Sequence, residues 1–207
     1  MMPTPAAISN SALDEETARS ELYGLLAVLY YAPPTANLLA QLRVAVNEAP
    51  AAGAFLEEPW RGLIAAARAL VDGAIQAEHH SLFGGIGKPE VYLYGSHFLS
   101  GFLNEKPLAK LRNELDSLGL TRDDSMSETE DHFAYLCEVM RHLIAGEDVA
   151  VANLTRQREF FSTHIQPWVL TMCDDLQKHP KAKFYAAVAQ LTRAFMGVEA
   201  QGFDMLA

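Results

Sequence analysis

Apolar residues recur every three or four positions through most of this 207-residue chain, which restricts it to folds built from helices. The clearest examples are Leu22, Leu25, Leu26 and Leu29 near the N-terminus, and Phe133, Leu136, Cys137, Met140, Leu143 and Ile144 further on. No segment shows the alternation of apolar and polar residues that is typical of a half-buried strand, and no internal repeat is evident. The sequence therefore predicts an all-α protein, a single compact multi-helix domain of about eight to ten helices.

Proline, glycine and capping residues predict where the helices begin and end. The first helix must end before Pro33-Pro34, and Thr35 is a suitable N-cap for the next. A longer helix is expected to start near Pro59-Trp60 and to continue through Ile75. Pro107 begins another helix and Gly119 follows its end.

The C-terminal third of the chain predicts three further helices, at 149–163, 167–179 and 183–199. A glycine-rich loop near 84–96 interrupts the helical pattern in the middle of the chain. Residues 1–12 are expected to form a flexible N-terminal tail, and residues 13–207 the all-helical domain.

The charge balance argues against nucleic acid as a partner. The chain has 16 Lys and Arg against 26 Asp and Glu, a formal net charge of -10. Binding to a phosphate backbone requires a basic surface. An acidic chain instead fits a basic partner, although many proteins are acidic for solubility alone.

Several features predict a cytoplasmic protein that does not insert stably into a membrane. The longest strongly apolar run, residues 25–32, is too short to span a bilayer. No Lys or Arg precedes Arg19, so the chain lacks the basic start of a secretory signal. Cys137 and Cys173 lie in apolar helical patterns and are expected to be free core thiols in a reducing compartment.

The segment from Ser127 to Met140 concentrates acids and a histidine within a few residues. Ser127 and Glu130 have the spacing of a capping box, which predicts a helix that begins at Ser127. Glu128 and Asp131 would then lie on the face opposite the apolar stripe. Such a face could receive a cationic partner, or it could simply be the solvated side of a well-capped helix.

Motifs for nucleotide or metal chemistry are incomplete. Residues 85–88 read Gly-Ile-Gly-Lys, but a P-loop would need Gly at Leu82 and Ser or Thr at Pro89. The densest cluster of potential metal ligands is 78–80, Glu-His-His, and the sequence has neither a His-Glu-x-x-His motif nor the paired Glu-x-x-His set of a di-metal bundle. The sequence therefore predicts no cofactor and no metal.

The sequence also carries no signature of nucleophilic catalysis. Ser96 follows a glycine but lacks the Gly-x-Ser-x-Gly elbow, and neither cysteine has electropositive surroundings. Nothing requires an enzyme. A small helical metalloprotein or enzyme that uses the region of Asp131 and His132 remains the alternative.

The loop from Leu82 to Leu99 gathers aromatic and aliphatic residues in an irregular, glycine-rich stretch. These side chains could plug the core from a loop or line a binding site, and the sequence favours neither interpretation.

Four motifs in this order resemble the TorD/DmsD/NarJ family of chaperones for molybdenum-cofactor oxidoreductases. They are Glu78-x-x-x-Leu82-Phe83 followed by Tyr94-Gly95-Ser96; Glu128-Thr-Glu-Asp131-His132; Phe160-Phe161-x-x-His164-Ile-Gln-Pro167-Trp168; and Phe184-Tyr185. The chain departs from the family pattern at Thr129 and Leu93, where Pro is common, and at Tyr94, where some relatives have Trp.

The resemblance implies a cytoplasmic chaperone without enzymatic activity. It would bind the twin-arginine signal peptide of a molybdoenzyme catalytic subunit and assist its folding, cofactor loading and export timing. Carboxylates such as Glu128 and Asp131 can bind guanidinium groups, and an apolar cleft can accept the apolar run of the peptide. The peptide-binding residues that the resemblance implies are Leu82, Phe83, Tyr94, Ser96, Glu128, Asp131 and His132. Self-association is left open.

Overall fold

The computed structural model describes residues 10–45, 55–84, 88–123 and 126–205, and these form helices without any strand. The helices are α1 (Asn10–Tyr31), α2 (Ala36–Val44), α3 (Glu57–Ala69), α4 (Asp72–Phe83), α5 (Gly95–Ser100), α6 (Lys106–Ser117), α7 (Phe133–Ala145), α8 (Leu154–Phe160), the π-helical turn η1 (Phe161–Ile165), α9 (Gln166–Lys178) and α10 (Phe184–Asp204). The predicted all-α fold is confirmed. None of the described helices combines the length and hydropathy needed to cross a membrane.

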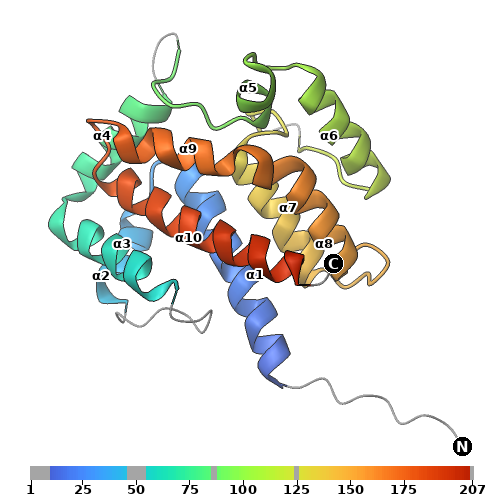
Figure 1. The fold of residues 1–207 in the computed structure, drawn as a ribbon. Helices are drawn as coiled ribbons and strands as arrows, with labels where there is room; N and C mark the ends of the chain where they lie inside the picture. The colour runs from blue at the N-terminus through green and yellow to red at the C-terminus, as the bar shows by residue number, and fades with distance from the viewer. Residues whose placement is uncertain (1–9, 46–54, 85–87, 124–125, 206–207) are drawn as a thin grey trace, which may run out of the picture.

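The helices surround one apolar core. Helix α1 packs most extensively on α7, and α10 packs against both α9 and α3. In Figure 1, α9 and α10 lie side by side in front of α1, with α2 and α3 on one side and α5 and α6 on the other. The largest fully buried side chains are aromatic, among them Trp168, Tyr23, Tyr30 and Phe133. Burial of each such side chain contributes about 1.5–3 kcal/mol to stability.

Several helices begin or end where local residues predict it. Helix α1 ends at Tyr31, before the two prolines, and the Thr35 hydroxyl accepts a hydrogen bond from the Leu38 amide at 3.2 Å. Gly119 follows α6 with a φ of +71°, a conformation that glycine adopts without strain. Helix α1 begins at Asn10, so positions 10–12 of the expected tail are helical, and positions 1–9 lie outside the described residues.

The prediction of one long helix from residue 59 to residue 75 is wrong. The chain is extended at Leu70, which separates α3 from α4. Arg43 of α2 stabilises this break from a distance. Its guanidinium donates to the carbonyls of Ala67 and Leu70, both at 2.8 Å, and pairs with Asp72 at 2.6 Å. The last carbonyls of α3 are thereby satisfied without a further helical turn.

The helix expected to begin at Ser127 begins instead at Phe133. Its N-cap is His132, whose Nδ1 accepts a hydrogen bond from the Ala134 amide at 3.2 Å. The segment before it is not helical, and Arg122 satisfies two of its carbonyls, donating to that of Met126 at 2.7 Å and that of Glu128 at 3.1 Å. Glu128 and Asp131 therefore do not belong to a helix face.

The helix expected at 149–163 begins only at Leu154, and it joins the helix expected at 167–179 through η1 into one continuous helical segment. Pro167 lies in the first turn of α9 and lacks an amide hydrogen, so the regular hydrogen-bond ladder is interrupted there. The Trp168 indole donates to the carbonyl of His164 at 2.6 Å, which satisfies one backbone acceptor in this turn.

Both cysteines are buried and free, as the sequence predicts. Burial raises the pKa of the Cys173 thiol to about 12 and raises that of Cys137 as well. Neither thiol is therefore ionised at neutral pH.

Candidate functional site

Two of the motif segments meet in space at the start of α5 and α7. Tyr94 and His132 form an isolated antiparallel bridge. The Gly95 amide donates to the Asp131 carbonyl at 2.9 Å, and the Phe133 amide donates to the Leu93 carbonyl at 2.7 Å. The glycine-rich loop is thus fixed to the acidic segment by main-chain hydrogen bonds.

Asp131 supports this junction from inside the protein. Its side chain is only 3% exposed. One carboxylate oxygen accepts from the Ser96 amide at 2.8 Å, and the other accepts from the Thr129 hydroxyl at 2.6 Å. Because both oxygens are engaged and buried, Asp131 does not present a free carboxylate to a ligand here. This placement differs from the expected role of Asp131 as a receiver of guanidinium.

Beside this junction lies a hollow of about 280 Å³, which we call the aromatic cleft. It is lined by Tyr30, Tyr31, Pro33, His79, His80, Phe83, Gly84, Pro89, Val91, Tyr92, Leu93, Tyr94, Leu103, Glu128 and His132. Four of the seven residues expected at a peptide site lie in this lining: Phe83, Tyr94, Glu128 and His132. The other three, Leu82, Ser96 and Asp131, are buried outside the lining. Positions 85–87 of the glycine-rich loop lie outside the described residues.

Glu128 brings a negative charge to the aromatic cleft. Its carboxylate accepts hydrogen bonds from the Tyr94 hydroxyl and, at 3.2 Å, from the Ser127 hydroxyl. Burial and the bond to Glu128 raise the pKa of Tyr94, so its hydroxyl stays protonated. Among the described residues that line the cleft, there is no Lys or Arg to neutralise Glu128. Glu128 is half-buried and lines the cleft, and its carboxylate oxygens keep lone pairs for a cationic ligand.

His132 contributes a neutral ring to the cleft wall. Its ring meets those of Tyr94 and Tyr31 edge-on, with centroids 5.1 Å and 6.4 Å apart. Burial lowers the pKa of His132 to about 4, although the charges of Glu128 and Asp131 oppose this shift. The ring is therefore neutral at neutral pH and does not repel a cation.

Glu78 has a structural role that the sequence did not reveal. Its carboxylate accepts three main-chain hydrogen bonds at the start of α10, from Lys183 at 2.9 Å, Phe184 at 3.2 Å and Tyr185 at 2.8 Å. These partners lie more than a hundred positions away, so no local pattern could have identified them. In the part of the chain that the structure describes, no group of three or more His, Cys, Asp or Glu side chains is placed to hold a metal ion.

A second hollow of about 280 Å³ lies between α1 and α7, and we call it the α1–α7 groove. It is lined by Ala27, Val28, Tyr31, Ala32, Met126, Ala134, Tyr135 and Glu138. Tyr31 lines both this groove and the aromatic cleft, so the two hollows adjoin. Val28 is 50% exposed, which leaves apolar surface available to a partner.

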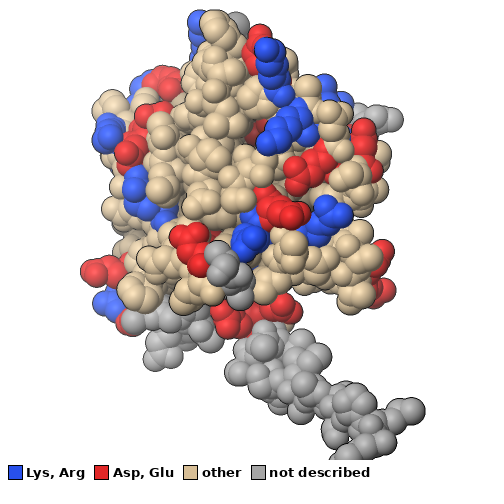
Figure 2. Space-filling view, turned by 45° about the vertical axis from the view of Figure 1, so that its right-hand side comes forward, with Lys and Arg blue, Asp and Glu red and all other residues tan. Residues whose placement is uncertain are grey.

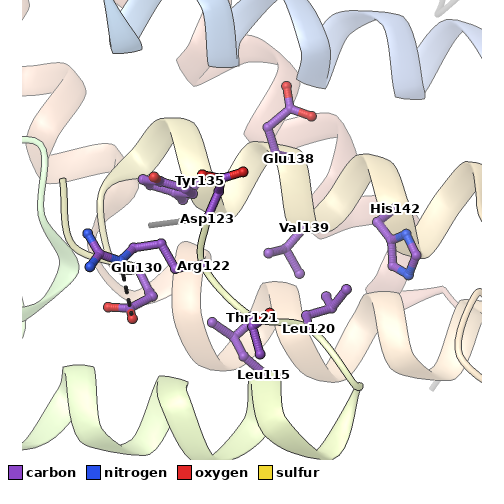
Figure 3. A pocket seen from close by; sticks show the side chains of 10 residues that line it. All are labelled: Leu115, Leu120, Thr121, Arg122, Asp123, Glu130, Tyr135, Glu138, Val139 and His142. Carbon is purple, nitrogen blue, oxygen red and sulfur yellow. Dashed lines mark ion pairs between the residues drawn. The ribbon is translucent and has the colours of Figure 1, made fainter. Parts of the chain in front are cut away.

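A third hollow of about 210 Å³ shares Tyr135 and Glu138 with the groove (Figure 3). Three acidic side chains line it, Asp123, Glu130 and Glu138. Glu130 is already paired with Arg122 at 3.8 Å, drawn as a dashed line in Figure 3, and with Arg112 at 2.8 Å. Glu138 pairs with Arg141 at 3.0 Å. Glu130 is therefore a poorer receiver of an incoming guanidinium than Glu128.

One face of the molecule bears on the expectation that this protein does not bind nucleic acid. Figure 2 shows a face on which Lys and Arg are interspersed with Asp and Glu, around a broad area that carries neither. This face has no continuous basic patch of the kind that phosphate backbones require.

Comparison with known proteins places the chain in a family. The model of the family described as nitrate reductase delta subunit matches residues 49–174, more than half of the chain. The matched region contains the aromatic loop and the acidic segment.

Curated relatives bear the name Chaperone protein TorD. The protein from Vibrio cholerae serotype O1 is 28% identical over 112 residues, which are 51% of this chain and 51% of the relative. Those from Aliivibrio fischeri and Salmonella arizonae are each 26% identical, over 133 and 137 residues, covering 60% and 64% of this chain and 62% and 63% of the relatives. The chain thus spans about half the length of the first relative and somewhat more of the others. It belongs to the nitrate reductase delta subunit family, the TorD and NarJ family of chaperones that its sequence motifs resemble.

Proposed function

We propose that this protein is a cytoplasmic chaperone that binds the twin-arginine signal peptide of a molybdenum-cofactor oxidoreductase. In this role it assists the folding of the catalytic subunit, its cofactor loading and the timing of its export. Membership of the family supports the proposal, as does the name of the curated relatives, which is that of a chaperone and not of an enzyme. The observation that carries it is the half-buried Glu128, the one Asp or Glu in the described lining of an aromatic cleft that contains no Lys or Arg.

The guanidinium groups of the peptide would bind at Glu128. Carboxylates bind guanidinium through charge-assisted hydrogen bonds, and the planar guanidinium also stacks on aromatic rings. Tyr94 and His132 present such rings beside the carboxylate, and His132 is neutral there. The cleft therefore combines the charge and the flat apolar walls that suit arginine.

The apolar run of the peptide would continue along the α1–α7 groove. Tyr31 lines both hollows, so a peptide anchored in the cleft can pass directly onto Val28 and Ala27. The groove lining is apolar apart from the Tyr hydroxyls and Glu138, and no Lys or Arg belongs to its described lining. A hydrophobic segment that follows two arginines matches this order of charged cleft and apolar groove.

Replacing Glu128 by glutamine should weaken binding of a twin-arginine peptide about tenfold, because a charge-assisted hydrogen bond is lost. The Gln side chain keeps an acceptor for the Tyr94 hydroxyl, so the cleft should retain its shape. Fluorescence anisotropy with a labelled peptide measures the affinity. Binding to the parent should also weaken as salt is added without vanishing, because the apolar contribution is not screened.

The matched control is Glu147→Gln, which removes the same charge from an exposed loop beyond the far end of α7. Helix α7 has 13 residues, so this position lies about 20 Å along the helix from His132. Equal affinities for Glu128→Gln and the parent would show that the cleft is not the arginine site. A parent that bound a scrambled peptide equally well would contradict the signal-peptide function itself.

Replacing Val28 by glutamine should weaken binding of the full peptide about fivefold, because half-exposed apolar surface in the groove becomes polar. The same substitution should leave unchanged the binding of a truncated peptide that keeps the two arginines and lacks the apolar run. Calorimetry with both peptides measures the two affinities.

Leu170→Gln is the control for Val28→Gln, since Leu170 is 43% exposed on α9 and lines none of the three hollows. It should bind both peptides like the parent. If Val28→Gln lost affinity for the truncated peptide as well, the groove would not be the site of the apolar run.

A further inference from the structure

A salt bridge between Glu138 and Arg141 lies at the end of the α1–α7 groove. Glu138 belongs to the groove lining, and Figure 3 shows its side chain pointing from α7 toward α1. Arg141 follows about one turn later on α7, beyond the described lining. Its guanidinium donates to both carboxylate oxygens of Glu138, at 3.1 Å and 3.0 Å. The apolar lining therefore stops at a pair of opposite charges.

Gly24 of α1 gives Arg141 the space to lie across both helices. A Cβ at position 24 would be only 3.0–3.2 Å from Nε, Cδ and Cζ of Arg141, which is closer than side-chain atoms normally approach. The guanidinium thus lies against the bare backbone of α1 while it stays bonded to Glu138 of α7. Glycine is unfavourable inside a helix, and here its missing side chain leaves the room that Arg141 fills. Arg141 thereby closes this end of the groove.

Two contacts between α1 and α7 give the length of the groove. At the end next to the aromatic cleft, the rings of Tyr31 and Tyr135 meet edge-on, with centroids 6.3 Å apart. At the other end Arg141 lies against Gly24. Between these contacts each helix makes about two turns, a distance of about 10 Å. An extended peptide rises about 3.3 Å per residue, so about three of its residues fit between the two contacts.

We propose that Arg141 is a specificity-determining residue that limits the apolar run bound in the α1–α7 groove to about three extended residues. The inference rests on the proposed function, because the signal peptide is the occupant of the groove. Apolar side chains gain affinity by leaving water for an apolar surface. Beyond the third residue they would meet Arg141 and Glu138, whose side chains are 45% and 49% exposed and stay solvated. Further residues of the run would therefore add nothing to the affinity.

Peptides that carry two arginines followed by one to six apolar residues test this limit. In calorimetry, affinity for the parent should rise about threefold with each of the first three residues and then level off. With Arg141→Ala the rise should continue for at least one further residue, because the groove then extends over Gly24. The readout is the length at which affinity levels off, since removing a positive charge strengthens the binding of every cationic peptide alike.

Arg61→Ala is the matched control. Arg61 also pairs with an acid on its own helix, Glu57, and lines none of the three hollows. Its removal changes the net charge by the same amount and should leave the levelling-off length at the third residue. Both substituted arginines are about half exposed, so both variants should melt close to the parent.

Replacing the fourth apolar residue of the peptide by serine provides the second measurement. The change should leave binding to the parent unaltered and weaken binding to Arg141→Ala about threefold. If Arg141→Ala levelled off at the same length as the parent, or if affinity for the parent kept rising through the sixth residue, the inference would be overturned and the proposed function would stand. A parent that did not prefer the twin-arginine peptide to a scrambled one would overturn the proposed function and this inference with it.

Discussion

Replacing Glu78 by alanine should lower the free energy of unfolding by about 3 kcal/mol. The carboxylate is buried and accepts hydrogen bonds from the amides of Lys183, Phe184 and Tyr185, which begin α10. Alanine leaves these donors without partners, and the loss of charged hydrogen bonds in a buried place costs about 1.5–3 kcal/mol or more. The loss also removes a negative charge that stabilises the positive end of the α10 dipole. Urea denaturation followed by circular dichroism measures the change.

The matched control for Glu78→Ala is Glu58→Ala, an exposed acid in the first turn of α3. Its loss should cost no more than about 1 kcal/mol, because a solvated acid near a helix N-terminus contributes only that much. Equal urea midpoints for Glu78→Ala and Glu58→Ala would show that the Glu78 carboxylate does not stabilise α10.

Glu78 also illustrates which parts of the fold a sequence can predict. Where the signals for a helix end are local, as at Thr35 and Gly119, the sequence predicted the boundaries and the structure confirms them. Helix α10 receives no side-chain cap from its own N-cap residue, Lys183. Its cap comes from α4, and sequence spacing carries no information about a contact of this range.

Two of the wrong boundaries have the same origin. The capping-box spacing of Ser127 and Glu130 was present, but Glu130 pairs instead with Arg112 of α6 and the chain stays non-helical until Phe133. Between α3 and α4 the apolar periodicity continued without interruption, and Arg43 of α2 satisfies the carbonyls at the break. In both places a tertiary contact of an arginine prevailed over a local helical preference.

The residues that the family resemblance implies for a peptide site separate into two groups in the structure. Phe83, Tyr94, Glu128 and His132 line one cleft, whereas Asp131 and Ser96 lie buried beside it and bind each other. In the sequence, His79 stood out only within the candidate metal cluster at 78–80, and the structure places it in the lining of the cleft.

Replacing Asp131 by alanine should lower the free energy of unfolding by about 2 kcal/mol and weaken peptide binding as a consequence. The substitution removes the acceptor of the buried Ser96 amide, and a lost hydrogen bond to a charged group costs about 1.5–3 kcal/mol. The start of α5 and the bridge between Tyr94 and His132 would lose their support. Because Tyr94 carries one wall of the cleft, affinity for the twin-arginine peptide should fall without any direct contact between Asp131 and the peptide.

The variant Asp131→Asn distinguishes this indirect effect from direct binding of arginine. Asparagine keeps an oxygen that can accept from the Ser96 amide, and its amino group can donate to the Thr129 hydroxyl, so the junction should survive. Peptide affinity and its dependence on salt should then remain close to those of the parent, whereas Glu128→Gln should reduce both. Anisotropy titrations at low and high salt, with the unfolding midpoint of each variant measured alongside, provide the comparison. If a stable Asp131→Asn lost as much affinity and salt dependence as Glu128→Gln, the buried carboxylate would have to become exposed and bind guanidinium itself when the peptide enters the cleft.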